Sequence, residues 1–212
     1  MDQTRRDLFE ADDRMIDENP FRFTLLVVAV NQSAISFYCM KKAKATATIF
    51  RHREEGIPLS VLLGSFYFGY CVGIVAYLIE PKWMAWSAIG LTAWVRWAGA
   101  ALLMVGAALI CWGLIDLGKN FAFAVTPKEK NRLVTTGLYH WVRHPLYTAF
   151  LVEAVGISLL MANWFVATMA GLLWALLVYR TRQEEEKLIE RFGDEYGDYM
   201  KRVGRFFPRL VR

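Results

Sequence analysis

The sequence predicts an all-α, polytopic membrane protein with about five transmembrane helices. Hydrophobic residues make up 56% of its 212 residues and charged residues only 21%, a more apolar and less charged balance than that of an ordinary soluble domain. Five runs reach or approach the roughly 20 apolar residues that a helix needs to cross a bilayer. They occupy residues 21–40, 57–79, 94–115, 145–162 and 164–179. The length of the chain fits one integral membrane domain, which we expect to cover residues 1–212.

The N-terminal half is expected to hold an acidic segment and three membrane helices. Residues 1–20 are rich in aspartate and glutamate, whereas a cleaved signal peptide begins with basic residues, so we expect the first apolar run to be retained as a helix. Polar residues 31–33 weaken that run in its middle, and the second run contains no charge. Arg96, near the start of the third run, is the only charge that we place inside a span. Residues 21–115 therefore predict three spans.

Small residues on the second and third spans predict close helix packing. Gly99, Gly106 and Gly113 recur every seven residues, nearly two helical turns, and Gly69 and Gly73 form a pair four residues apart. Such spacing lets another helix approach closely. We interpret both patterns as contacts within one chain and expect a monomer.

The C-terminal part, residues 116–212, is expected to hold a loop, a helical hairpin and a tail. The fourth and fifth apolar runs are joined at residues 162–164, which is too short for anything except a hairpin turn between two helices. After Arg180, apolar residues recur at helical spacing among charged ones despite two glycines. This pattern predicts an amphipathic cytoplasmic tail helix that lies on the membrane surface or caps a pocket. Residues 206–208, which include a proline, are expected to end it.

Basic residues set the expected orientation of the spans. Of the 25 Lys and Arg residues, 19 lie in residues 41–56, 116–144 and 180–212, which follow alternate spans. The positive-inside rule makes these three segments cytoplasmic. We therefore expect a multi-pass integral membrane protein with its N-terminus outside and its C-terminus in the cytoplasm.

Two charged clusters flank the predicted hairpin. Arg143-His144-Pro145 precedes its first helix, and Arg180 with Glu184 follows its second. Because both ends of a hairpin emerge on the same side of a membrane, these side chains are expected to converge. Each cluster taken alone is also typical of headgroup anchoring or of a surface ion pair. Their convergence on the cytoplasmic side favours a ligand site.

Pro145 is expected to begin a helix, because its missing N–H costs nothing in the first turn. The residue before a proline is driven to an extended conformation, so His144 should lie at a corner between loop and helix. The free N–H groups at this helix start, together with the Arg143 guanidinium, suit an anionic group such as a carboxylate or phosphate.

Several motifs follow one another between about Asn120 and Pro208. They are Leu133-Val134-Thr135-Thr136-Gly137-Leu138-Tyr139, Arg143-His144-Pro145-Leu146-Tyr147, Arg180 four residues before Glu184-Glu185, and Phe192-Gly193-Asp194-Glu195-Tyr196 with Tyr199 and Arg202-Val203. In this order and spacing they resemble the isoprenylcysteine carboxyl methyltransferase family, and more broadly the phospholipid methyltransferase superfamily of integral membrane enzymes. Residues 1–115 resemble it only in being apolar helices.

The resemblance implies an S-adenosylmethionine-dependent methyltransferase with its cofactor at the cytoplasmic face, between the loop, the hairpin and the tail. Position by position, it places the cofactor contacts on Arg132, Leu133, Val134, Tyr139, His144, Pro145, Tyr147 and Glu184. It gives Arg180 the role of orienting the acceptor and makes His144 a second catalytic candidate. The alignment through the acidic run leaves Glu185 and Glu186 as alternatives to Glu184. Eukaryotic members commonly have a His where this sequence has Asn131, so the resemblance implies no cofactor contact there.

The residue types agree with what the resemblance implies. Glu184 is able to accept hydrogen bonds from the ammonium or ribose hydroxyls of S-adenosylmethionine, and Tyr139 or Tyr147 to cover its apolar or cationic parts. A carboxylate acceptor held by Arg180 would need no general base, whereas an amine, thiol or phenol would need His144 or a glutamate. The membrane setting favours a lipophilic acceptor from the bilayer, such as an isoprenylcysteine-like carboxylate, an isoprenoid or a phospholipid headgroup.

Other classes of protein remain as alternatives. An NADPH-dependent sterol or isoprenoid reductase has a similar C-terminal membrane architecture, and a membrane scaffold or small transporter would need no catalytic site. We expect no nucleic-acid partner, because the basic residues lie at the ends of apolar runs rather than among stacking aromatics. The three cysteines stand alone in apolar runs, without the spacing of metal ligands or of a disulfide framework, so we expect no metal.

Overall fold

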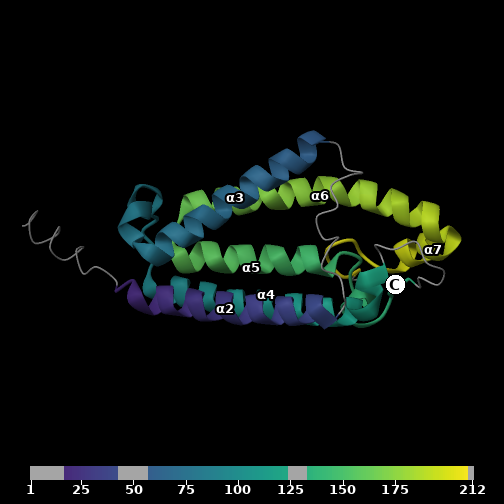
Figure 1. The fold of residues 1–212 in the computed structure, drawn as a ribbon, viewed down its shortest axis with the longest axis horizontal. Coiled ribbons are helices and arrows are strands. Elements are labelled where there is room, and N and C mark those ends of the chain that lie inside the picture. The colour runs from purple at the N-terminus through teal and green to yellow at the C-terminus, as the bar shows by residue number, and fades with distance from the viewer. Residues whose placement is uncertain (1–16, 43–56, 124–132, 210–212) are drawn as a thin grey trace, which may run out of the picture.

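The computed structural model describes residues 17–42, 57–123 and 133–209, and within them the chain is all-α, as predicted (Figure 1). The elements, with η for a 3₁₀ helix, are α2 Asn19–Lys42, α3 Ile57–Ile79, η2 Pro81–Ser87, α4 Ala93–Phe123, η3 Gly137–His140, α5 Pro145–Met161, α6 Trp164–Phe192 and α7 Asp194–Arg202. The long helices lie along the axis of an elongated bundle, and one end of α3 leans away from it.

Three helices in this part of the chain are long and apolar enough to cross a membrane. They are Leu59–Ile79 within α3, Ala93–Asp116 within α4, and α6. α5 is a shorter apolar helix of 17 residues, and α2, with 24 residues, has the length of the predicted first span. The five helices occupy the positions of the five predicted spans. Two of the helices continue beyond the predicted spans, α4 to Phe123 and α6 to Phe192.

The helix α6 is longer than a membrane is thick. Its 29 residues span about 43 Å at about 1.5 Å each, against about 30 Å for the hydrocarbon layer. Residues 164–179 are apolar, whereas residues 180–192 carry many charges. The charged end of α6 therefore lies outside the membrane.

The predicted hairpin is confirmed, and its turn is held by side-chain hydrogen bonds. Ala162 adopts a left-handed conformation with φ 48°, which ends α5. Asn163 begins α6 by accepting a hydrogen bond from the Val166 N–H at 3.1 Å. Its amide also donates to Ser87 Oγ in η2 at 2.8 Å. This buried asparagine ties the hairpin to the connection between α3 and α4.

Glycines on α4 make the contact with α5 possible, as the small-residue spacing predicted. A Cβ on Gly99 would lie 2.6 Å from the Leu160 N atom, and one on Gly106 would lie 2.6 Å from the Glu153 N atom. Neither distance is compatible with a side chain on α4. The predicted packing contact of these glycines thus occurs within one chain.

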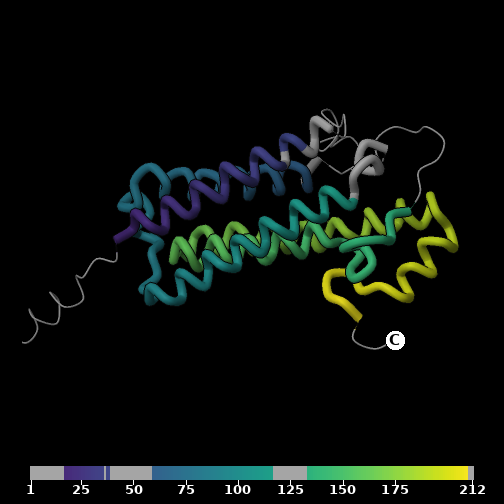
Figure 2. Tube along the Cα trace, turned by 90° about the horizontal axis from the view of Figure 1, so that it is seen from below, coloured from purple at the N-terminus to yellow at the C-terminus, as the bar shows by residue number. Residues whose placement is uncertain are grey.

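The tail prediction needs two corrections. Gly193, with φ 54°, ends α6, so the tail is not one continuous helix but the charged end of α6 followed by α7. A residue with a side chain would be strained in this left-handed conformation, which is why the helix breaks at this glycine. α7 ends at Arg202, before the predicted stop at residues 206–208. After α7 the chain turns back toward the segment that precedes α5 (Figure 2).

We predicted Arg96 as the only charged residue inside a span, and this prediction is wrong. Glu153 lies in the middle of α5, where its carboxylate accepts a hydrogen bond from the Gln32 amide of α2 at 3.1 Å. A polar side chain within a membrane usually faces a polar partner on a neighbouring helix. Gln32, in the polar middle of α2, therefore has a structural reason, since it faces Glu153.

Arg96 closes the end of the bundle opposite the charged clusters. Its guanidinium contacts both carboxylate oxygens of Glu18, at 2.7 and 2.6 Å, and the Tyr77 hydroxyl at 2.9 Å. Its Nε donates to the Leu160 carbonyl at 3.0 Å, and the Phe21 ring lies 3.8 Å from its central carbon. We call these five residues the outer cluster.

Candidate functional site

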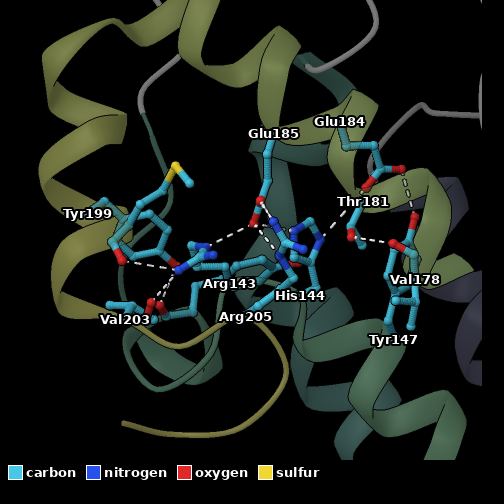
Figure 3. A network of polar contacts seen from close by, with 12 residues as sticks. Arg143, His144, Tyr147, Val178, Thr181, Glu184, Glu185, Tyr199, Val203 and Arg205 are labelled. Atoms are coloured by element: carbon cyan, nitrogen blue, oxygen red, sulfur yellow. Dashed lines mark hydrogen bonds and ion pairs between the residues drawn. The ribbon is translucent and has the colours of Figure 1, made fainter. Parts of the chain in front are cut away.

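The two charged clusters that flank the hairpin do meet, as predicted (Figure 3). We call this site the charged mouth. It consists of Arg143, His144 and Tyr147 around the start of α5, Arg180, Glu184 and Glu185 on α6, and Arg205 after α7. Side chains far apart in the sequence thereby surround two neighbouring carboxylates.

Glu185 lies at the centre of the mouth and is buried. Its Oε1 accepts from Arg143 Nε at 3.0 Å and from Arg205 Nε at 3.2 Å, and His144 Nε2 lies 3.2 Å away. Arg205 Nη2 forms a second bond, to Oε2. Burial alone would raise the pKa of Glu185, but the hydrogen bonds from His144, Arg205 and Arg143 outweigh it and hold the pKa at about 2. Glu185 is therefore ionised at neutral pH and committed to contacts within the protein.

Glu184 is the more accessible of the two carboxylates. Its Oε1 accepts from the Tyr147 hydroxyl at 2.6 Å and lies 3.0 Å from Arg180 Nε. Its side chain is 30% exposed, against 4% for that of Glu185. Glu186, the third glutamate of the run, is exposed. The three glutamates, which the sequence could not distinguish, thus differ in burial: Glu185 is buried, Glu184 is half-buried within the mouth and Glu186 is exposed.

His144 lies between the two carboxylates. Its Nε2 is 3.2 Å from Glu185, and its Nδ1 is 3.7 Å from Glu184 Oε2. The ring stacks on Tyr147, with centroids 5.5 Å apart and planes inclined by 11°, and the Phe206 ring lies 5.8 Å away on the tail. These contacts fix the ring in one orientation.

The segment after α7 forms one wall of the mouth. The backbone N–H groups of Arg143 and His144 donate to the carbonyls of Gly204 and Arg205 at 2.8 and 3.0 Å. Thr148 Oγ1 donates to the Phe206 carbonyl at 2.8 Å. Our reading of the sequence did not include Arg205, because a lone arginine after a tail helix has no local pattern that marks it. The tail also lies against the start of α5, where we had expected an anionic ligand.

Pro145 occupies the first position of α5, as predicted. Tyr139 and its loop are also close to the mouth, since the Tyr199 hydroxyl of α7 donates to the Tyr139 carbonyl at 2.5 Å. Burial raises the pKa of the Tyr139 phenol above its ordinary value, with Tyr199, Asp116 and Glu184 adding to the shift, so the phenol is protonated at neutral pH. Tyr139 therefore brings a protonated phenol to the loop that lies beside α7.

The remaining residues that we predicted to contact the cofactor precede Tyr139 in the sequence. Leu133 packs against the buried residues of α7, and Val134 is half-buried beside it. Arg132 lies outside the described residues. Asp116, at the end of the apolar part of α4, accepts from the Leu138 N–H at 2.7 Å and was not among the predicted residues.

The donor and acceptor set of the mouth fits a ligand that combines positive charge, hydroxyl groups and a flat ring. Glu184 offers a reachable carboxylate, Tyr147 and His144 offer stacked aromatic faces, and Tyr139 offers a hydroxyl. S-adenosylmethionine has all three features. Among the described residues, no group of three or more His, Cys, Asp and Glu side chains is arranged to hold a metal ion.

Comparisons with known proteins point to one family. The model of the isoprenylcysteine carboxyl methyltransferase (ICMT) family matches residues 99–190. Protein-S-isoprenylcysteine O-methyltransferase from Rattus norvegicus is 31% identical over 164 residues, which cover 71% of this chain and 56% of the rat protein. Protein-S-isoprenylcysteine O-methyltransferase B from Arabidopsis thaliana is 28% identical over 159 residues, 72% of this chain and 79% of that protein.

Two further similarities bear on function and fold. The nickel-cobalt-cadmium resistance protein NccN of Alcaligenes xylosoxydans xylosoxydans is 34% identical over 115 residues, 54% of this chain and 53% of NccN. A solved structure of the eukaryotic intramembrane Ras methyltransferase ICMT matches with a TM-score of 0.52 at 19% identity, over 88% of this chain and 68% of that chain. The chain spans about half the length of the rat and human relatives, at 56% and 44%. It shares the fold of a multi-pass integral membrane protein.

Proposed function

We propose that this chain, which matches the model of the isoprenylcysteine carboxyl methyltransferase family over residues 99–190, transfers a methyl group from S-adenosylmethionine to a lipophilic acceptor at the charged mouth. The observation that carries the proposal is the accessible Glu184 carboxylate, held by Tyr147 beside the stacked ring of His144. A carboxylate at the edge of an aromatic wall suits a cationic ligand. Buried Glu185 supports this wall rather than contacting the ligand.

We assign separate roles to the residues of the mouth. Glu184 accepts hydrogen bonds from the ammonium or hydroxyl groups of the cofactor, and Tyr147, His144 and Tyr139 line its sides. S-adenosylmethionine, when bound, supplies an electrophilic methyl group. Arg180, whose side chain is 27% exposed, orients the acceptor. Catalysis then depends mainly on positioning two reactants and on excluding water.

The chemistry of the acceptor decides whether a proton must move. A carboxylate acceptor, as the family name suggests, is already ionised at neutral pH and needs only the orienting charge of Arg180. An amine, thiol or phenol must lose a proton, and His144 is the imidazole at the mouth that would accept it. The proposal favours a carboxylate, because both ring nitrogens of His144 already face glutamates.

The proposal is tested by calorimetric titration of the protein in detergent with S-adenosylmethionine. Glu184→Gln should weaken binding by about 2 kcal/mol, roughly thirtyfold, since it removes one partnered charge from a partly desolvated site. His144→Ala should also weaken binding, whereas Arg180→Ala should leave it near the wild-type value and raise the KM for the acceptor. Exposed Glu186→Gln is the matched control and should bind normally.

Two results would contradict this assignment. Unchanged affinity in Glu184→Gln would move the contact to another glutamate or away from α6. Binding of NADPH but not of S-adenosylmethionine in parallel titrations would favour the reductase alternative instead.

A separate assay distinguishes an active enzyme from a non-catalytic scaffold or transporter. It measures methyl transfer from labelled S-adenosylmethionine to a prenylated cysteine carboxylate.

We also propose that the acceptor enters from the bilayer, because the mouth lies at the ends of apolar helices. Each CH₂ of an apolar chain gains about 0.8 kcal/mol on burial. Acceptors with one headgroup and increasing chain length should therefore become better substrates in nanodiscs. Equal rates for chain-free and long-chain acceptors at matched accessible concentration would point to a water-soluble acceptor.

The cytoplasmic location of the mouth is a further proposal that rests on the distribution of Lys and Arg. In a variant without the native cysteines, a cysteine at position 186 and one within residues 125–131 should react with an impermeant reagent from the same side. A cysteine at exposed position 82 in η2 should react from the opposite side. Labelling of positions 186 and 125–131 from different sides would break the shared-site argument.

A further inference from the structure

One face of α6 connects the charged mouth with the apolar part of the same helix. Trp174, Val178, Thr181 and Glu185 follow at spacings of four, three and four residues, which places them on one side of a helix. Thr181 is fully buried and donates its hydroxyl to the Val178 carbonyl of its own helix at 2.7 Å. The face therefore runs from a charged end into an apolar interior.

Aromatic rings continue the wall of the mouth along this face. The Phe206 ring lies 5.8 Å from His144 and 5.8 Å from Trp174, measured between centroids. Tyr147 also stacks on His144. A series of four rings thus leads from the partner of Glu184 to the indole of Trp174.

The indole of Trp174 carries a polar atom that the surrounding protein does not use. Its Nε1 is buried and has no hydrogen-bond partner among residues 17–42, 57–123 and 133–209. A buried donor without a partner is unfavourable, and phenylalanine would fill such a position without that cost. The N–H group therefore needs a hydrogen-bond acceptor that does not come from the described part of the chain.

The depth of this N–H group within the apolar layer indicates what kind of molecule would supply the hydrogen-bond acceptor. Trp174 precedes Arg180 by six residues and Glu184 by ten, which corresponds to about 9 Å and about 15 Å along the helix axis. A group that reaches Trp174 from the mouth thus lies well inside the apolar layer. An all-hydrocarbon chain has no atom there that accepts a hydrogen bond.

We propose that Trp174 determines acceptor specificity by donating its indole N–H to an oxygen within the apolar chain of the acceptor. The acceptor is then a lipid with a carbonyl or comparable oxygen in its chain, about 9 Å deeper along the axis of α6 than Arg180. Its chain lies along Trp174 and the Phe206 ring. This inference rests on the proposed methyl transfer and specifies the substrate class of the same site.

The test uses two synthetic acceptors with the same S-alkyl cysteine carboxylate and the same chain length. One has a ketone placed about 9 Å from the carboxylate along the extended chain, and the other has only methylene groups. Methyl transfer from labelled S-adenosylmethionine is measured in nanodiscs. The wild-type protein should prefer the ketone by roughly tenfold in kcat/KM, the equivalent of one good hydrogen bond.

Trp174→Phe should reduce this preference to about one, because it keeps a ring and removes the N–H group. Trp164→Phe, on the same helix but at its exposed outer end, is the matched control and should retain the preference. Moving the ketone along the chain in the wild-type protein gives a second measurement that needs no variant. The preference should be largest near about 9 Å.

The inference is overturned if the wild-type protein uses both acceptors equally at every ketone position, or if Trp174→Phe keeps the preference. Transfer to both acceptors at equal rates would leave the proposed methyltransferase intact and remove only the role of Trp174. Absence of both transfer and S-adenosylmethionine binding would instead refute the proposed function, and the inference with it.

Discussion

The two ends of the helix bundle each bury an arginine against a glutamate, but they use the pair differently. In the outer cluster, Arg96 binds Glu18, the Tyr77 hydroxyl and the Leu160 carbonyl, and these contacts use every nitrogen of its guanidinium. In the charged mouth, Glu185 is the central group and gathers Arg143, Arg205 and His144 around one carboxylate. The outer cluster thus uses all the donors of its arginine internally, whereas the mouth has a second carboxylate, Glu184, beside Glu185.

The difference teaches how a membrane protein separates support from binding. At the outer end, burial raises the pKa of Glu18, but hydrogen bonds from Arg96 and Tyr77 outweigh it and hold the pKa below its ordinary value. The result is one ion pair that joins α4 to the start of α2. At the mouth, Glu185 takes the same supporting role, and in the proposed function its neighbour Glu184 contacts the ligand. Adjacent glutamates on one helix thus face different surroundings.

The strongest test of this division is Glu185→Gln. The change leaves Arg143 and part of Arg205 without their counter-charge in a buried site, and breaking a buried ion pair costs about 3–5 kcal/mol. Because the Arg205 side chain is 35% exposed, we expect the lower end, about 3 kcal/mol. Thermal unfolding in detergent measures the loss, with exposed Glu186→Gln as the control. A normal melting temperature combined with lost cofactor binding would reverse the roles of Glu185 and Glu184.

Arg96→Met should have a smaller effect and only on stability. It removes hydrogen bonds to Glu18, Tyr77 and Leu160 but leaves Glu18 partly exposed to water, so we expect a loss of about 2 kcal/mol. The affinity for S-adenosylmethionine should stay at the wild-type value, because the outer cluster and the mouth lie at opposite ends of α5. Weaker cofactor binding in this variant would show that the two ends are coupled.

Much of this architecture is readable from the sequence because hydropathy and chain connectivity determine it. The apolar runs predicted the long helices, and the short link at residues 162–164 predicted the hairpin. A hairpin places both of its ends on one side, which is why Arg143 and Glu184 were expected to meet. Their proximity is confirmed, whereas the roles of the individual site residues remain predictions.

The sequence could not show which long-range partner each polar residue would find. Helical periodicity does not say whether Glu184 or Glu185 points inward, because that depends on the rotation of α6 against α5. Arg205 reaches Glu185 only because Gly193 breaks the helix and the tail turns back. Glu153 was overlooked within an apolar run, and its partner Gln32 lies on α2, with α3 and α4 between them in the sequence. Each of these contacts arises from packing between distant segments.

The smallest expected effect is a pH dependence that distinguishes the supporting glutamate from its neighbours. The pKa of Glu185 is about 2 in the folded protein, against an ordinary value of 4.5. A lowered folded-state pKa means that this carboxylate stabilises the protein fully above about pH 4.5 and loses that contribution as the pH falls toward about 2. The gap in melting temperature between wild type and Glu185→Gln should therefore narrow as the pH is lowered from 5 to 3. The narrowing is partial, because the carboxylate is still mostly ionised in the folded protein at pH 3. The gap between wild type and Glu186→Gln should stay constant. A wild-type advantage over Glu185→Gln that is unchanged down to pH 3 would mean that the ionised carboxylate does not hold the mouth together, and that the glutamine forms equivalent hydrogen bonds.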